Sequence, residues 1–223
     1  MGDGRAGTRD RLVAAASALF AERGFHGTTV RDIARRAGVN VAAGNYHYGS
    51  KKALYLEVLG AQFAATRAEL ARRGASRPPG ELARLSHAEL VRLLRSRVQA
   101  MLDLLIGPPP GLHGTLMQRE MCDPSEALPV IVAEFIVPLV DEMRDIVVRL
   151  APGLGPKAAD RCVFSITGQA LFYRFTMPAM LHMLGQPAYR PGFTRELAEH
   201  ITEFSLGGMA QLAAAATRRR HAG

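Results

Sequence analysis

The sequence predicts an all-α protein. Aliphatic and alanine-rich segments recur along its 223 residues at the three- and four-residue spacing of amphipathic helices. No segment combines sustained alternation of apolar and polar residues with the β-branched enrichment that is typical of strands. Clusters of glycine and proline separate the helical segments, most clearly GASRPPG at 74–80 and GPPPG at 107–111.

The first two predicted helices are short and have clear ends. A helix over about 8–23 carries an apolar stripe at helical spacing, and Gly24 ends it. Thr29 can cap a second helix over about 30–37, with Asp32 three residues later to complete a pair that resembles a capping box. Thr28 is an alternative cap.

The next predicted helix is the most unusual part of the sequence. Gly38 ends the second helix, and Asn40 can cap a third helix of about eight residues over 41–48. Gly49 stops this helix, and Ser50 caps a long helix that runs to about residue 73. A helix as short as 41–48 has little surface for packing, so we expect something outside the protein to use it.

The rest of the chain continues the helical pattern. The further helices are expected at about 86–106, 114–121, 124 or 129 to 150, 156–184, and 194–216. The sequence therefore predicts about nine helices in two domains. We expect one domain over residues 1–52 and a larger helical domain over residues 53–223, with the helix after Ser50 bridging them.

Basic residues gather at the N-terminus. The formal net charge is +8, and the first 52 residues hold nine Lys and Arg against four Asp and Glu. A basic N-terminal quarter favours a polyanion as partner.

Several classes of protein are disfavoured by the sequence. The most apolar window, residues 127–140, contains Glu134 and two prolines and is too short to span a membrane. No signal peptide, disulfide framework or zinc-type cysteine spacing is present, so we expect a cytoplasmic protein. We also find no G-x-S-x-G, P-loop or H-E-x-x-H pattern, and the seven histidines lack ligand spacing. We expect no cofactor, no metal and no enzyme activity.

The second and third predicted helices, with the glycine turn between them, form a helix-turn-helix. Such a motif inserts the N-terminal part of its second helix into the major groove of DNA. Val41, Ala42, Asn45 and Tyr46 would lie on the face that is available to bases and nearby backbone. Asparagine can pair with adenine, and alanine or valine can contact a thymine methyl group.

Other residues around the motif are suited to phosphate. Tyr46, His47 and Lys51 are expected to contact the backbone on one side, with Lys51 at the start of a helix. Thr28 or Thr29 would do so on the other side of the groove. His47 could instead be a satisfied polar residue at a helix end, and Lys51 could be part of a solvated pair.

The order of these residues resembles a known family. Residues 8–59 combine F-AERGF at the end of a helix, TTV--IA--AGV and YHY-GSK-AL, and in this respect the chain is similar to the DNA-binding domain of TetR-family bacterial transcriptional regulators. The resemblance implies an all-α homodimer that binds a palindromic operator and releases it when a small molecule enters the C-terminal domain. Residues 1–52 would then be the helix-turn-helix DNA-binding domain, and residues 53–223 the domain for ligand binding and dimerisation. One departure is Gly44, where the family usually has a larger aliphatic residue.

The second half resembles one subgroup of that family. GVNVAAGNYHYGSK, QREMCDP at 118–124, EFIVP at 134–138 and SITGQALFYR at 165–174 look like the CecR-like (YbiH-like) subgroup, which has its own C-terminal domain. The candidate residues for the ligand pocket are Met117, Arg119, Glu120, Met121, Phe135, Gln169 and Tyr173. Two alternatives stay open: Arg119 and Glu120 could form an ion pair that fixes their helix, and Gln169 and Tyr173 could face a dimer partner.

Together, these features lead to one hypothesis and two rivals. The hypothesis is a ligand-responsive, sequence-specific repressor that dimerises through the helices at 156–184 and 194–216 and binds operator DNA and a small-molecule inducer. One rival is a nucleoid-type protein that binds DNA regardless of sequence. The other is a small-molecule carrier or enzyme on an all-α scaffold.

Overall fold

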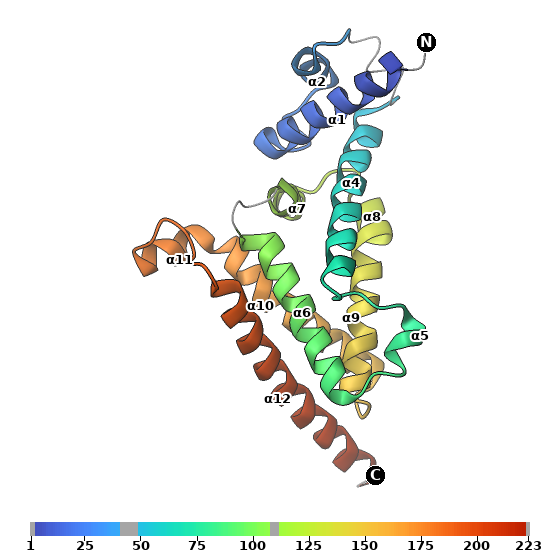
Figure 1. Ribbon diagram of the computed structural model, residues 1–223, viewed down its shortest axis with the longest axis vertical. Coiled ribbons are helices and arrows are strands. Elements are labelled where there is room, and N and C mark those ends of the chain that lie inside the picture. The colour runs from blue at the N-terminus through green and yellow to red at the C-terminus, as the bar shows by residue number, and fades with distance from the viewer. Residues whose placement is uncertain (1–2, 41–48, 108–111, 222–223) are drawn as a thin grey trace. The chain divides into compact units, whose positions relative to one another are not determined.

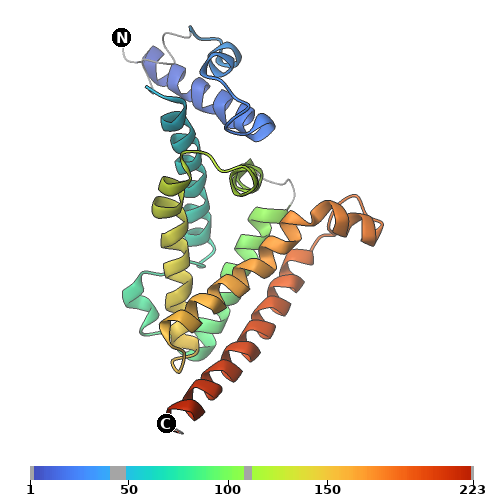
Figure 2. The same ribbon diagram turned by 180° about the vertical axis from the view of Figure 1, so that it is seen from behind.

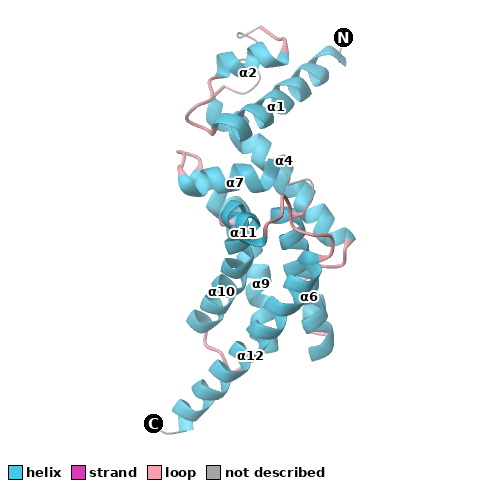
Figure 3. Ribbon diagram, turned by 90° about the vertical axis from the view of Figure 1, so that its left-hand side faces the viewer, coloured by secondary structure: helices cyan, strands magenta, loops and turns pink. Residues whose placement is uncertain are grey.

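The computed structural model describes residues 3–40, 49–107 and 112–221. All regular elements in these ranges are helical, and no strand occurs among them (Figure 3). The prediction of an all-α fold is confirmed. The predicted helix over 41–48 lies outside the described residues.

The chain divides into two compact units that interleave along the sequence. Residues 1–65 and 111–136 form unit 1, and residues 66–110 and 137–223 form unit 2. The division that we expected at residues 52 and 53 stays a prediction. Residues 111–136 come from the expected C-terminal domain and yet belong to the unit that holds the N-terminal helices.

Unit 1 is built on the N-terminal helices. It contains α1 (Asp3–Arg23), α2 (Val30–Ala37), the first part of α4 (Lys51–Arg72), α7 (Leu112–Cys122), α8 (Leu128–Ile131) and the π-helix η1 (Val132–Ile136). Apolar residues of three helices form its core, namely Leu12, Ala16, Leu19, Phe20, Ile33, Ala34, Tyr55 and Leu59. The rings of Phe20 and Tyr55 meet edge to face, with centroids 4.7 Å apart. Both α2 and α7 contact α1.

Unit 2 is a bundle of long helices. It contains α5 (Pro79–Leu82), α6 (His87–Ile106), α9 (Val137–Leu150), α10 (Pro156–Phe175), α11 (Met177–Leu184) and α12 (Phe193–His221). Helices α6, α10 and α12 lie side by side in Figures 1 and 2, and α9 packs on α6 and α10. Arg97 of α6 is buried in this bundle, and its guanidinium pairs with Glu142 of α9 at 2.5 Å.

Two of the predicted helices are interrupted at prolines. The segment expected as one helix over 156–184 breaks at Thr176, because Pro178 has no N–H for the carbonyl of residue 174 and its ring clashes with that carbonyl. The segment expected to run from 124 or 129 to residue 150 contains the π-helix η1 directly before Pro138. Pro138 has no N–H to donate to the helical ladder, and π-helical turns commonly mark such irregularities inside helices.

Candidate DNA-binding site

Helix α2 begins at the predicted cap. The Thr29 side chain accepts a hydrogen bond from the backbone N–H of Asp32 at 3.1 Å, and its hydroxyl donates to Asp32 Oδ2 at 2.6 Å. The hydrogen bond from Thr29 is the main reason that the pKa of the Asp32 carboxyl lies below its ordinary value, and the charge of Arg35 lowers it further. Thr29 is exposed, so its position fits the predicted contact with phosphate at a helix start.

The turn after α2 has the backbone conformation that the sequence suggested. Gly38 has φ +64°, in the left-handed region that favours glycine, and its N–H returns to the carbonyls of Ala34 and Arg35. The N–H of Val39 also bonds to the carbonyl of Ala34 at 3.0 Å. Two consecutive N–H groups therefore close the end of α2 and direct the chain into the segment predicted as the recognition helix.

The segment after this turn carries most of the predicted DNA contacts. Val41, Ala42, Asn45, Tyr46 and His47 lie outside the described residues. Their roles stay predictions.

The chain is described again from Gly49, which has φ +65°. Ser50 then caps α4 as predicted, since its hydroxyl oxygen accepts from the N–H of Ala53 at 3.1 Å. The segment 41–48 is thus bracketed by two glycines with positive φ, at positions 38 and 49.

Lys51 ties the start of α4 to the turn that follows α1. Its Nζ donates to the carbonyl oxygen of Phe25 at 2.9 Å and lies 4.1 Å from the centroid of the Phe25 ring. An ammonium group has three N–H donors, so one bond to Phe25 leaves two for other acceptors. Lys51 therefore has a structural role in addition to the phosphate contact that we predicted.

Thr28 has an internal role instead of the predicted contact with DNA. It is fully buried, and its hydroxyl lies 2.8 Å from the carbonyl oxygen of Gly24 and 3.2 Å from that of Leu19. These contacts hold the turn between α1 and α2 against the end of α1. We leave Thr28 out of the proposed interface because its hydroxyl cannot reach a phosphate.

Basic side chains lie on the exposed surface of α2. Arg31, Arg35 and Arg36 are exposed, and two of them form ion pairs within unit 1. Arg35 pairs with Asp32 at 2.5 Å, and Arg36 pairs with Glu22 at 2.7 Å. Exposed ion pairs contribute little to stability, so these arginines can exchange partners with phosphate at low cost.

Arg119 connects α7 to the end of α1, a contact that sequence analysis missed. Its Nε donates to the carbonyl of Ala21 and a terminal nitrogen donates to the carbonyl of Glu22, both at 2.8 Å. These carbonyls belong to the last turn of α1, where the backbone has no further N–H partners in the helix. The guanidinium therefore caps α1 from another element, and its charge suits the negative end of the helix dipole.

Glu120 connects the same helix to α4. It is 1% exposed, and Tyr55 donates its hydroxyl proton to Oε2 at 2.9 Å. The other oxygen accepts from the N–H of Ser125 at 3.0 Å and from its hydroxyl at 2.9 Å. Burial, with the adjacent Glu120 carboxyl, raises the pKa of Tyr55 above its ordinary value. We call Tyr55, Arg119, Glu120 and Ser125 the α7 clamp.

The other candidate pocket residues of unit 1 differ in their exposure and contacts. Met117 is half-buried and Met121 is 42% exposed. Phe135 stacks on Phe63, with ring centroids 4.7 Å apart, and also lies against Gly60. Arg119 and Glu120 fix α7 within unit 1 through backbone carbonyls, Tyr55 and Ser125, and their part in ligand binding stays a prediction.

Gln169 and Tyr173 belong to unit 2 and lie on one surface groove. This groove has a volume of about 430 Å³, and its walls are Gly168, Gln169, Phe172, Tyr173, Leu197, His200 and Ile201. We call it the α10–α12 groove. The Gln169 amide donates to the carbonyl of Ser165 at 3.3 Å and to the hydroxyl of Ser205 at 3.4 Å. The seven predicted ligand residues are therefore divided between the two compact units.

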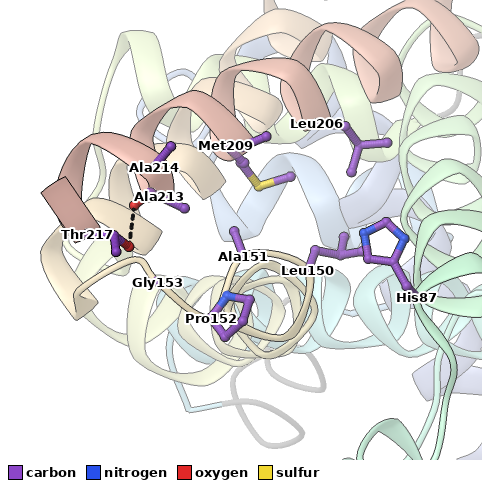
Figure 4. Close-up of a pocket in the computed structure, with 11 residues that line it drawn as sticks. His87, Leu150, Ala151, Pro152, Gly153, Leu206, Met209, Ala213, Ala214 and Thr217 are labelled. Atoms are coloured by element: carbon purple, nitrogen blue, oxygen red, sulfur yellow. Dashed lines mark hydrogen bonds between the residues drawn. The ribbon is translucent and has the colours of Figure 1, made fainter.

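A second hollow in unit 2 lies near the end of α12. It has a volume of about 450 Å³ between Leu150–Gly153, the start of α6 and the last turns of α12 (Figure 4). Its walls are mainly aliphatic, with His87 and Thr217 as polar groups, and the Thr217 hydroxyl is bonded to the carbonyl of Ala213 at 3.1 Å. None of the predicted ligand residues lines this hollow.

The described part of the chain contains neither a candidate membrane span nor a candidate metal cluster. No helix there is both long enough and apolar enough to span a membrane. The same residues contain no group of three or more His, Cys, Asp or Glu side chains that could hold a metal ion.

Comparison with known proteins identifies the family. Residues 12–58, which include the whole helix-turn-helix, match the family model described as bacterial regulatory proteins, tetR family. Residues 90–209, more than half of the chain, match the model of the C-terminal domain of the HTH-type transcriptional dual regulator CecR. The chain belongs to the TetR family, with a CecR-type C-terminal domain.

Individual relatives of this TetR-family chain agree with the match. The HTH-type transcriptional dual regulator CecR of Shigella flexneri is 28% identical over 217 residues, which cover 91% of this chain and 93% of that protein. The HTH-type transcriptional repressor KstR2 of Rhodococcus jostii is 45% identical over 56 residues, which cover 25% of this chain and 28% of that protein.

A solved structure supports the fold of the TetR-family chain. SCO4454, a TetR-family transcriptional regulator from Streptomyces coelicolor, matches with a TM-score of 0.66 and 18% identity, over 92% of this chain and 97% of that one. The resemblance that the sequence suggested, to the TetR family and to its CecR-like subgroup, is confirmed.

Proposed function

We propose that this chain is a ligand-responsive, sequence-specific transcriptional repressor that a small-molecule inducer releases from a palindromic operator. The observation that carries the proposal is the frame around residues 41–48. The Thr29 cap, the Gly38 turn and the Ser50 cap hold the two ends of that segment, within a region that matches the TetR-family model. The activity belongs in the cytoplasm, where bacterial DNA lies.

In this proposal the residues around the frame have different tasks. Thr29, Tyr46, His47 and Lys51 contact phosphates and set the position of the protein on the duplex. Val41, Ala42 and Asn45 contact base edges and determine which sequence is bound.

A homodimer would place two such frames on one operator. Exposed aromatic side chains on α10 and α12 support dimerisation through these helices: Phe164 is 59% exposed, Phe172 52% and Phe204 67%. On α12, Gly207 and Gly208 follow Phe204 by one turn, and apart from the surrounding backbone of α12 no atom lies within 4 Å of a Cβ added at either position. Large rings beside small residues allow the helices of two copies to pack closely in a four-helix contact.

Release would follow from a shift between two states of the dimer. In one state the two recognition helices fit half-sites about one helical turn apart, roughly 34 Å, and in the other they do not. Helix α4 runs from unit 1 into unit 2, and the α7 clamp attaches α7 to both α1 and α4 inside unit 1. A ligand that moves α4 or α7 would change the positions of the caps and the glycine turn that hold the two ends of residues 41–48. A coupling free energy of roughly 1–3 kcal/mol would lower operator affinity about 5- to 150-fold.

Footprinting of the DNA beside the chain's own gene tests the proposal. A specific regulator protects a short region with two symmetric half-sites on one face of the duplex. A nucleoid-type binder would protect the DNA without preference, and a carrier or enzyme would leave no footprint. Either of these results would contradict the proposal.

A further inference from the structure

Helix α11 is unusually apolar for an exposed helix. Its sequence is MPAMLHML, in which His182 is the only polar residue, and none of its eight residues is buried. Met183 is 78% exposed and Leu184 is 49% exposed. The helix extends sideways from the end of α10, which is the main element that it contacts (Figures 1 and 2). A helix that is apolar on all sides is normally covered.

The composition of α11 argues against a membrane as its cover. Eight residues are too few to span a bilayer. Helices that lie in a membrane surface carry lysine and arginine on a polar face, and α11 contains neither. A protein surface is therefore the better partner.

The position of α11 indicates which protein surface covers it. The exposed rings of Phe164, Phe172 and Phe175 follow one face of α10 and lead directly into α11. The α10–α12 groove is formed by α10 and α12 and includes Phe172 of the same α10 face among its walls. An apolar helix and an apolar groove on one surface are self-complementary under a twofold axis.

The exposed area of the proposed dimer face also indicates that α11 takes part in the interface. A typical stable interface buries about 800 Å² on each partner. The exposed parts of the Phe164, Phe172 and Phe204 rings offer on the order of 350 Å², if a ring contributes roughly 200 Å² in full. Helix α11 is the adjoining apolar surface that can supply much of the difference.

We propose that α11 is a dimerisation arm that lies in the α10–α12 groove of a second copy of this chain, while its own groove receives the arm of the partner. The proposal deepens the dimer of the proposed function and rests on it. Met183 and Leu184 enter the partner's groove, against the walls formed by Gly168, Leu197 and Ile201.

The first test compares dimer affinities by sedimentation velocity. The double variant Met183→Lys, Leu184→Lys should weaken the dimer at least about tenfold, because two desolvated contacts become charged. Gln186→Lys is a matched control, since it adds a charge to an exposed residue just after the helix and should leave the dimer unchanged. The fold should survive both changes because α11 buries no side chain, which circular dichroism would check.

The second test uses a cross-link. In a Cys122→Ser background, which removes the exposed native thiol, the double variant Met183→Cys, His200→Cys should form a disulfide-linked dimer under mild oxidation. A cross-link within one chain would place α11 on its own groove and would overturn the proposal.

The outcomes separate the arm from the dimer itself. If the lysine variant dimerises as tightly as the natural chain, α11 is not a dimerisation arm, and the dimer forms through α10 and α12 alone. If the natural chain is a monomer at micromolar concentration, both ideas fail. Flotation of the natural chain, but not of the lysine variant, with anionic vesicles would assign α11 to a membrane surface and would also overturn the proposal.

Discussion

At the scale of single residues, Glu120 and Thr29 illustrate two ways in which unit 1 satisfies its polar groups. Both oxygens of Glu120 accept hydrogen bonds in the interior, from Tyr55 on one side and Ser125 on the other. Thr29 and Asp32 satisfy each other at an exposed helix start. The buried network resists change more strongly, because a buried acceptor that loses its donor cannot turn to water.

Replacing Tyr55 with Phe should therefore destabilise the protein. The change keeps the ring and leaves Glu120 Oε2 without the Tyr55 donor, at a cost of about 1–3 kcal/mol in the free energy of unfolding. Tyr189→Phe in unit 2 is the matched control, because its hydroxyl bonds to the carbonyl of Tyr173 in a half-buried place and should cost less. Denaturant unfolding of both variants measures the difference, and equal losses would contradict the role of Glu120.

Replacing Thr29 with Ala should remove the cap of α2 and cost about 1 kcal/mol, whereas Thr29→Ser should keep most of it. The pKa of Asp32 should also rise toward its ordinary value, because the hydroxyl that lowers it most is gone. A lowered carboxyl pKa stabilises the fold above the unfolded value of about 3.9, and this contribution is lost as the pH falls through the folded value. An NMR titration of Asp32 checks the direction, and an unchanged pKa in Thr29→Ala would contradict it.

Hydrogen-bond partners that are close together in the sequence could be predicted, whereas partners that are far apart in the sequence could not. Thr29 and Asp32 are three residues apart, so spacing alone pairs them. Tyr55 and Glu120 are 65 residues apart. The sequence left open whether Arg119 and Glu120 line a pocket or fix their helix, and only the fold identifies the groups that they contact.

At the scale of elements, caps and glycine turns were predicted more reliably than the continuity of long helices. The helix predicted to start near residue 86 does so at α6, where Ser86 and Glu89 form a capping box that the sequence analysis did not name. Helical spacing continues through Thr176 and through η1, so periodicity did not reveal those interruptions. Pro178 and Pro138 were the signals that could have done so, since each removes one hydrogen-bond donor from the helix.

The α7 clamp leads to a prediction about elements. Arg119→Ala should free the last turn of α1 and increase amide hydrogen exchange around residues 21–28, while dimer affinity stays unchanged. Operator affinity should fall about tenfold, because without the Arg119 cap the end of α1 would hold the neighbouring helix-turn-helix less firmly. Arg84→Ala removes an exposed arginine of unit 2 and serves as the control. Unchanged exchange at 21–28 in Arg119→Ala would show that the cap has no such effect.

At the scale of the whole molecule, the proposed function requires a dimer of two copies of the chain. A lysine at position 204 would place a charge on the proposed dimer face of α12, where Phe204 is 67% exposed. Phe204→Lys should raise the dissociation constant of the dimer at least about tenfold without loss of helix content. Light scattering across a dilution series measures this shift, and a dimer of unchanged affinity would exclude α12 from the interface.

The fold class and the helix-turn-helix could be predicted because they depend on local periodicity, caps and glycines. The return of residues 111–136 to the N-terminal unit could not, because it depends on contacts between distant parts of the chain.

In the proposed function, residues 41–48 contact base edges in duplex DNA, and competition between operator and random duplex is the sharpest test of this role. The natural chain should prefer its operator over random duplex by roughly a thousandfold or more. Asn45→Ala should reduce that preference, whereas Tyr46→Ala should weaken binding to all sequences and lower the salt dependence. Equal affinity of the natural chain for operator and random duplex, with no effect of either substitution, would contradict the account.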